Sequence, residues 1–147
     1  MKKITKKQLL NNLQKDVYCR IGVSKIKDAG VGVIAIKNIP KGVCPFKYPN
    51  NVSNPVYSKS IDITKKELNK LPKNIIKMIN DFCHNDNENY TIPQYGLNSL
   101  DISWYLNHNI NNNINIIDNN NNFLSFVTNK NIKKGDELYI NYNEYNI

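Results

Sequence analysis

Cysteine is scarce and scattered in this chain of 147 residues, which holds only Cys19, Cys44 and Cys83. The number is odd, and no two cysteines form the CxxC pair that many zinc and redox centres use. His84 follows Cys83 directly, but no Cys/His pair lies at metal-ligand spacing. The pattern argues against a disulfide framework, and we expect three reduced, mostly buried thiols and no bound metal.

Long hydrophobic runs are also missing. No stretch approaches the roughly 20 apolar residues that a membrane-spanning helix needs. The segment after the first lysines, Leu9-Leu10-Asn11-Asn12-Leu13, is too polar for the core of a signal peptide. We therefore expect a soluble, intracellular protein. With 40% apolar residues, a chain of this length suits one globular domain better than two.

Acidic residues are few in the first third of the chain. Residues 1 to 50 hold eleven Lys/Arg against Asp16 and Asp28, whereas residues 51 to 147 hold nine against ten acids. The first third therefore accounts for the whole formal net charge of +8. A basic segment of this kind can bind nucleic acid through its phosphates. A composition biased towards Asn, Lys and Ile explains the same charge without any partner, and both interpretations stay open.

The hydrophobic pattern predicts strands near both ends of the chain. At the start we expect an amphipathic helix from Thr5 through Gln14, with Leu9, Leu10 and Leu13 on one side. Three strands follow, namely Val17 to Val23 with alternate residues half-buried, Val31 to Ile36, and Val43 to Phe46. Towards the end we expect strands at Asn113 to Ile117, Phe123 to Thr128 and Glu137 to Tyr142.

The middle of the chain favours helices. Thr64-Lys65-Lys66-Glu67 has the capping-box pattern, and Pro72 ends the short helix that follows it. A helix of about ten residues comes next, with a core stripe formed by Ile75, Ile76, Met78, Ile79, Phe82 and Cys83. Ser99 is positioned to cap a short turn that contains Trp104 and Leu106. Finally, the phrase Ala35 to Gly42 recurs in outline as Thr128 to Gly135.

Three short motifs occur in a fixed order. They are Asp28-Ala29-Gly30-Val31-Gly32-Val33, then Leu106-Asn107-His108 with Asn113, and last Gly135-Asp136-Glu137-Leu138 running into Asn141-Tyr142. Each motif alone is weak, but their order and spacing over residues 17 to 142 resemble a SET domain. The repeated phrase is similar to a paired phrase of the same family. We therefore divide the chain into an N-terminal helical, basic segment (1–16) and a SET domain (17–147) with a helical insert at about 60–90.

The resemblance implies a fold, a cofactor and an activity. The fold is mostly β with short helices (α+β), built from several small sheets, with a C-terminal strand segment threaded in a knot-like arrangement. The cofactor is S-adenosylmethionine, and the activity is protein-lysine N-methylation with histone tails as the favoured substrate. The implied partner is a protein with a lysine side chain, histone favoured. Nucleic-acid contact through the basic first third and a homodimer stay open, and no membrane partner is expected. The location would be nuclear chromatin, or the host cell for a viral protein.

The resemblance also implies roles for individual residues. The glycine turn brings Ala29, Gly30 and Val31 close to the cofactor, and Asn107 and His108 hold it, with Tyr105 beside them. Tyr142 is the expected catalytic residue. Tyr90, Tyr95 and Tyr145 are weaker candidates for an aromatic lysine channel, because each also suits a structural role. Two other classes stay open, namely a catalytically silent SET-like binding module and a basic nucleic-acid-binding protein.

The chain departs from the family pattern at several positions. Between Asn107 and Asn113 the usual Ser, Cys and Pro are absent, and we expect Ile110 to replace the cysteine as a buried apolar group. Asn141 stands where Asp is usual before the tyrosine, and Trp104 where arginine is common. No cysteine-rich zinc region follows Tyr142. The lysine channel would therefore be closed by residues 143–147, by the middle insert or by a second subunit.

Overall fold

The computed structural model describes residues 4–49, 60–118 and 124–145. The helices are α1 (Lys6–Lys15), α2 (Lys65–Leu68) and α3 (Lys73–Phe82), with 3-10 turns η3 (Leu97–Ser99), η4 (Ile102–Tyr105) and η5 (Tyr142–Tyr145). The strands are β1 (Cys19–Val23), β2 (Val31–Ala35), β3 (Ser60–Thr64), β4 (Asn89–Pro93), β5 (Asn107–His108), β6 (Ile114–Asp118), β7 (Leu124–Thr128) and β8 (Glu137–Ile140). No helix in these ranges is long and apolar enough to cross a membrane.

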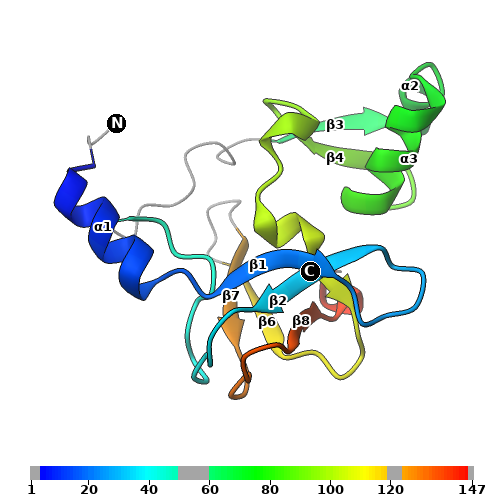
Figure 1. The fold of residues 1–147 in the computed structure, drawn as a ribbon. Coiled ribbons are helices and arrows are strands. Elements are labelled where there is room, and N and C mark those ends of the chain that lie inside the picture. The colour runs from blue at the N-terminus through cyan, green and yellow to red at the C-terminus, as the bar shows by residue number, and fades with distance from the viewer. Residues whose placement is uncertain (1–3, 50–59, 119–123, 146–147) are drawn as a thin grey trace.

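The strands form three small sheets, as Figure 1 shows. The largest has the order β1-β2-β8-β5, in which β5 runs parallel to β8 and the other pairs are antiparallel. The antiparallel pairs β3–β4 and β6–β7 make the other two sheets. The expected class, mostly β with short helices, is confirmed, while the knot-like threading of the C-terminal segment stays a prediction.

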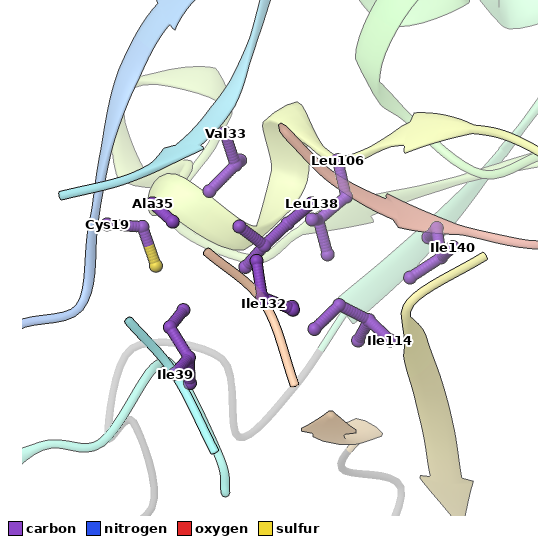
Figure 2. Close-up of a cluster of buried hydrophobic side chains, with 9 residues drawn as sticks. All are labelled: Cys19, Val33, Ala35, Ile39, Leu106, Ile114, Ile132, Leu138 and Ile140. Atoms are coloured by element: carbon purple, nitrogen blue, oxygen red, sulfur yellow. The ribbon is translucent and has the colours of Figure 1, made fainter. Parts of the chain in front are cut away.

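The main hydrophobic core lies beneath the four-stranded sheet and anchors the predicted site. Its buried side chains are Cys19, Val33, Ala35, Ile39, Leu106, Ile114, Ile132, Leu138 and Ile140 (Figure 2). Leu106 directly precedes the Asn107-His108 pair, and in β8 Leu138 and Ile140 lie on either side of Tyr139. Because interiors are close-packed, these contacts fix the backbone from which the polar side chains project.

The repeated phrase pairs with its own copy. Ile39 and Ile132 exchange both backbone hydrogen bonds, at 2.8 and 2.9 Å. The Lys134 N–H donates to the Asn38 side chain, and the Lys41 N–H donates to that of Asn131, both at 2.9 Å. Gly42 and Gly135, with φ of +83° and +90°, likewise donate to Thr128 and Ala35. The two copies are thus related by a local two-fold axis. Their reciprocal hydrogen bonds join the segment after β2 to the segment before β8.

The insert is not purely helical, which corrects one expectation. The strands β3 and β4, which pair antiparallel, come before α2 and after α3 in the chain. Together these elements pack around a second core of Leu68, Ile79, Cys83 and Tyr90. The capping box at Thr64 is confirmed, and α2 ends at Leu68 before Pro72. Met78 lies outside the expected stripe, since it is 39% exposed.

Two other expected elements differ. Residues 43–46 do not form a strand, because Val43 pairs only with Thr128 and the ring of Pro45 removes the next backbone donor. The turn with Trp104 is capped by Asp101, whose carboxylate accepts the Ser103 N–H at 2.9 Å, and not by Ser99.

The N-terminal apolar residues are less buried than their pattern predicts. Helix α1 forms with the predicted Thr5 cap, but Leu9, Leu10 and Leu13 are exposed and Asn12 is its only buried residue. Strand β1 lies at the sheet edge, so Val23 is 85% exposed. The half-buried alternation expected for Val17 to Val23 is therefore wrong except near Cys19.

Candidate active site

A cavity of about 440 Å³ lies where four separate segments of the chain meet. That size is within the usual range for small-molecule sites. It is lined by Asp28, Ala29, Gly30, Val31, Lys77, Asp81, Phe82, Trp104, Tyr105, Leu106, Asn107 and Tyr142. The glycine turn, the segment before β5 and the residue two positions after β8 thus share one cavity.

The glycine turn has a left-handed backbone at two positions. Asp28 has φ of +65° and Gly30 has φ of +74°, and the Gly30 carbonyl accepts the Ser24 N–H at 3.0 Å. A Cβ at Gly30 would meet no atom within 4 Å. The turn therefore presents backbone to the cavity, and glycine is favoured at position 30 by its φ angle.

Glu137 is a buried carboxylate behind this cavity, with 2% of its surface exposed. Its oxygens accept hydrogen bonds from the Ser24 hydroxyl at 2.8 and 3.1 Å and from the Lys25 N–H at 2.6 Å. The Asn107 amide at 2.9 Å and the Tyr139 hydroxyl at 3.0 Å complete the shell. Four donors from three segments therefore compensate the burial of this charge. The sequence motif indicated the strand but not this network.

The network lowers the pKa of Glu137. Burial alone would raise it, but the hydrogen bonds from Asn107, Lys25, Ser24 and Tyr139 outweigh burial and hold the pKa below its usual value of 4.5. Conversely, burial and then the bond to Glu137 raise the pKa of Tyr139 to about 12. At neutral pH the carboxylate is therefore ionised and the tyrosine hydroxyl is its donor.

This shift predicts acid sensitivity. Because the pKa of Glu137 is lower in the folded than in the unfolded state, the carboxylate stabilises the fold at pH values above about 4.5. That stability is lost as the pH falls through the folded-state pKa. In urea unfolding between pH 3 and 7, the free energy of unfolding of wild type is expected to rise more steeply than that of Glu137→Gln. Parallel curves would contradict the prediction.

Tyr142 lies on the cavity wall and is held from two sides. Its backbone N–H donates to His108 Nδ1 at 3.0 Å, and its hydroxyl donates to the Leu106 carbonyl at 2.7 Å. The His108 ring does not line the cavity but packs against Tyr142 with centroids 5.2 Å apart. Tyr142 is 47% exposed, yet desolvation raises its pKa. The phenol is therefore neutral at neutral pH.

The insert supplies a wall that the sequence motifs did not indicate. Lys77, Asp81 and Phe82 of α3 line the cavity, and Lys77 Nζ lies 2.7 Å from Asp81 Oδ2. The Phe82 ring packs against Tyr105 with centroids 5.0 Å apart. Of the three closures considered for the channel, the middle insert is the one that contributes these described side chains.

The aromatic wall differs from the weaker channel candidates. It consists of Phe82, Trp104, Tyr105 and Tyr142. Tyr90 is buried in the second core, because β4 turns it beneath α3. Tyr95 is 65% exposed and does not line the cavity. The side chain of Tyr145 lies outside the described residues.

Asparagine side chains hold the loop between β5 and β6. Asn113 donates to the Glu137 carbonyl at 2.9 Å and accepts the Tyr139 N–H at 2.7 Å, so it acts as a buried bridge to β8. Asn109 accepts the Asn111 N–H at 2.8 Å. Ile110 is 73% exposed, which corrects the expectation that it would be buried.

Comparison with known proteins decides the family. Residues 30–143 match the family model of the SET domain. The chain belongs to the SET-domain family. A comparison with curated proteins finds no significant match.

The solved structures share the SET fold. A humanized mutant of Polycomb Repressive Complex 2 from Chaetomium thermophilum, bound to the inhibitor GSK126, is 20% identical with a TM-score of 0.53, over 86% of this chain and 15% of that one. The autoinhibited complex bound to S-adenosylmethionine is 20% identical with a TM-score of 0.51, over 87% of this chain and 15% of that one. A Plasmodium falciparum protein described as a candidate histone methyltransferase is 23% identical with a TM-score of 0.49, over 85% of this chain and 92% of that one. The chain thus spans about 15% of the Polycomb chains it matches.

The SET-domain assignment identifies the cofactor. SET methyltransferases use S-adenosylmethionine, and one of the similar structures was solved with it. The cavity suits this molecule, because the open space above Gly30 leaves room against the backbone. Two acidic residues, Asp28 and Asp81, and one basic residue, Lys77, line the cavity, so its formal lining charge is negative and suits a ligand with a net positive charge. Family and fold together support protein-lysine methyltransferase activity.

Proposed function

We propose that this SET-domain protein transfers a methyl group from S-adenosylmethionine to lysine side chains of histone tails. One observation carries the proposal. The neutral phenol of Tyr142 shares a cavity with the glycine turn and with Asn107, although these groups come from opposite ends of the domain. A cofactor held against the turn and Asn107 would place its reacting group within the same enclosure as Tyr142.

Tyr142 serves this chemistry as a dipole and not as a base. Burial raises its pKa, so the phenol keeps its proton at neutral pH and donates a hydrogen bond to the Leu106 carbonyl. The dipole of the phenol would orient the incoming amine and stabilise the polarised methyl group. Bound S-adenosylmethionine supplies the electrophilic methyl group.

The lysine must reach the site without its proton. With an ordinary pKa near 10.4, deprotonation at neutral pH costs about 4 kcal/mol. The aromatic wall of Phe82, Trp104 and Tyr105 lowers this cost by desolvating the ammonium. The deprotonated nitrogen would then be the acceptor for the methyl group that S-adenosylmethionine would supply when bound. No residue of the chain needs to form a covalent intermediate.

The histone assignment rests on charge. The +8 chain would approach a nucleosome with its basic first third against DNA. Acids of the later part of the chain would border the peptide groove. Glu144 is exposed and is available for this role, Asp101 accepts hydrogen bonds from Tyr48 and Ser103, and the side chain of Asp118 lies outside the described residues. We propose a nuclear location.

Incubation with methyl-labelled S-adenosylmethionine tests the function. Purified protein is mixed with separated core histones and with nucleosomes, beside a Tyr142→Phe variant. Label on a histone lysine that disappears with the variant is expected. Cofactor binding without label on any histone would contradict the substrate class and favour a silent binding module. Absence of cofactor binding would contradict the enzyme itself.

A charge variant tests the nucleic-acid contact. Replacing Lys2, Lys3, Lys6 and Lys7 with glutamine is expected to weaken binding to nucleosomes and flatten its salt dependence, because fewer phosphates are neutralised. Methylation of an isolated histone peptide is expected to stay unchanged. Equal nucleosome binding by both proteins would show that the basic segment has no such role.

A further inference from the structure

The amide of Asn107 has one defined orientation. Its Nδ2 lies 2.9 Å from the Val31 carbonyl, 2.9 Å from Glu137 Oε1 and 3.2 Å from the Ser24 hydroxyl. A carbonyl and a carboxylate oxygen can only accept hydrogen bonds, so the nitrogen must face them. Within the described part of the chain, no group donates to Asn107 Oδ1. Asn107 lines the cavity, and its oxygen is the acceptor that remains for a ligand.

The carboxylate that orients Asn107 is itself fixed by groups that move little. The Lys25 N–H, which is backbone, donates to Oε2 at 2.6 Å, and the Tyr139 hydroxyl donates to the same oxygen at 3.0 Å. Gly32 lies against Oε1 so closely that a Cβ there would come within 2.1 Å of it. Glu137 is therefore confined between two backbone segments.

We propose that Glu137 is a positioning residue for cofactor binding, because it holds the Asn107 amide with its oxygen towards the cavity. The ligand group it prepares for is an N–H donor of S-adenosylmethionine, either the ammonium or the adenine amino group. This inference rests on the proposed function, since it takes the cavity as the cofactor site. Glu137 does not line that cavity, so its effect passes through Asn107.

The isosteric change Glu137→Gln inverts this arrangement. The Lys25 N–H cannot turn away, so it selects the oxygen of the new amide and leaves the NH2 group facing Asn107. Two amide nitrogens would then oppose each other. Turning the Asn107 amide over relieves this contact only by placing its oxygen against the Val31 carbonyl, so neither orientation keeps all its partners and the oxygen is no longer held towards the cofactor. The fixed acceptor is lost although no atom of the cavity wall has been removed.

The test measures the dissociation constant of S-adenosylmethionine by calorimetry, below the melting temperature of every variant. Glu137→Gln is expected to weaken binding by roughly 10-fold or more, the scale of one lost hydrogen bond. In turnover assays KM for the cofactor rises while kcat at saturation stays within about threefold. The matched control is Thr128→Val, an isosteric loss of buried hydrogen bonds to Pro40 and Val43 away from the cavity. It is expected to lower stability and leave the dissociation constant within about twofold.

The control separates positioning from general destabilisation. Tight wild-type binding with equal affinity for Glu137→Gln would overturn the inference and leave the proposed function intact. Weak binding by both Glu137→Gln and Thr128→Val would also overturn it, because stability alone would then explain the loss. No binding by wild type would instead refute the cofactor site on which the inference rests.

A second variant keeps the test decisive if Glu137→Gln does not fold. Asn107→Asp keeps an oxygen for the cofactor but places a carboxylate against Glu137 and the Val31 carbonyl. Displacement of the side chain is expected to weaken binding by roughly 10-fold, whereas unchanged or tighter binding of the cationic cofactor would overturn the inference. The ligand 5′-methylthioadenosine, which has the adenine amine but no ammonium, identifies the donor. A loss that persists with it assigns adenine, and a loss confined to S-adenosylmethionine assigns the ammonium.

Discussion

Tyr142→Phe is expected to lower kcat for methyl transfer by about 100-fold or more, with the dissociation constant of S-adenosylmethionine within about twofold of wild type. Removal of one preorganised polar group that acts on the transition state has effects of this order in other enzymes. The hydroxyl shares the cavity with the glycine turn, and the phenylalanine ring keeps the packing against His108. Single-turnover kinetics with labelled cofactor would measure the chemical step directly.

Tyr95→Phe is the matched control for this experiment. It removes the same hydroxyl from a tyrosine that is 65% exposed and away from the cavity. Its kcat is expected to equal that of wild type. Loss of the Leu106 hydrogen bond in Tyr142→Phe also removes a small stabilising contact, about 1 kcal/mol, so both variants are compared at a temperature where they are folded. Unchanged turnover by Tyr142→Phe would show that the hydroxyl has only the structural role of bonding to the Leu106 carbonyl.

The sequence predicted best where local backbone geometry decides the outcome. The glycine turn is an example, since Gly30 has the left-handed φ angle that glycine permits. The terminal strand is another, because Leu138 and Ile140 alternate with polar neighbours and are both buried. These signals depend on a few adjacent residues. The structure brings two of the motif residues, Asn107 and Tyr142, to one cavity.

Contacts between distant segments could not be predicted in the same way. The α3 wall of Lys77 and Asp81 depends on how the insert packs against the turn, and its helical pattern indicates only which face is apolar. Tyr90 is a weak channel candidate that better suits a structural role, and the pairing of β4 with β3 places it in the second core. Exposed Ile110 shows the same limit, since an apolar residue in a loop is buried only when another segment covers it.

Glu137 is the most informative of these cases. Its place in a strand next to Leu138 predicts burial on one side, and a charged residue there conflicts with that pattern. The structure resolves the conflict with donors from residues 24, 25, 107 and 139. Functional sites often break local rules in this manner. The second glycine of the turn motif, Gly32, is needed because the Glu137 carboxylate leaves no room for a Cβ at that position, and not because the cofactor approaches it.

Gly32→Ala is expected to be the most destabilising single substitution of a glycine in this chain. A Cβ at position 32 would lie 2.1 Å from Glu137 Oε1, 2.8 Å from its Cδ and 3.1 Å from Asn107 Nδ2. The carboxylate cannot retreat without breaking its bonds to Lys25 and Tyr139, and a displaced buried charge loses its compensation. We expect a loss of about 3 to 5 kcal/mol and a melting temperature lower by on the order of 10 °C. Thermal unfolding followed by circular dichroism would measure it.

Two comparisons show whether the clash with Glu137 is the cause. Position 30 has a positive φ but open space around an added Cβ. Gly30→Ala is therefore expected to lower the free energy of unfolding by only about 1 kcal/mol. In the double variant Gly32→Ala with Glu137→Ala, the shorter side chain leaves room for the new methyl group. The additional loss from Gly32→Ala in that background is then expected to fall below about 1 kcal/mol, which a double-mutant cycle would detect as strong coupling. Additive losses would locate the destabilisation in the β2 backbone and would separate Gly32 from the carboxylate that holds Asn107.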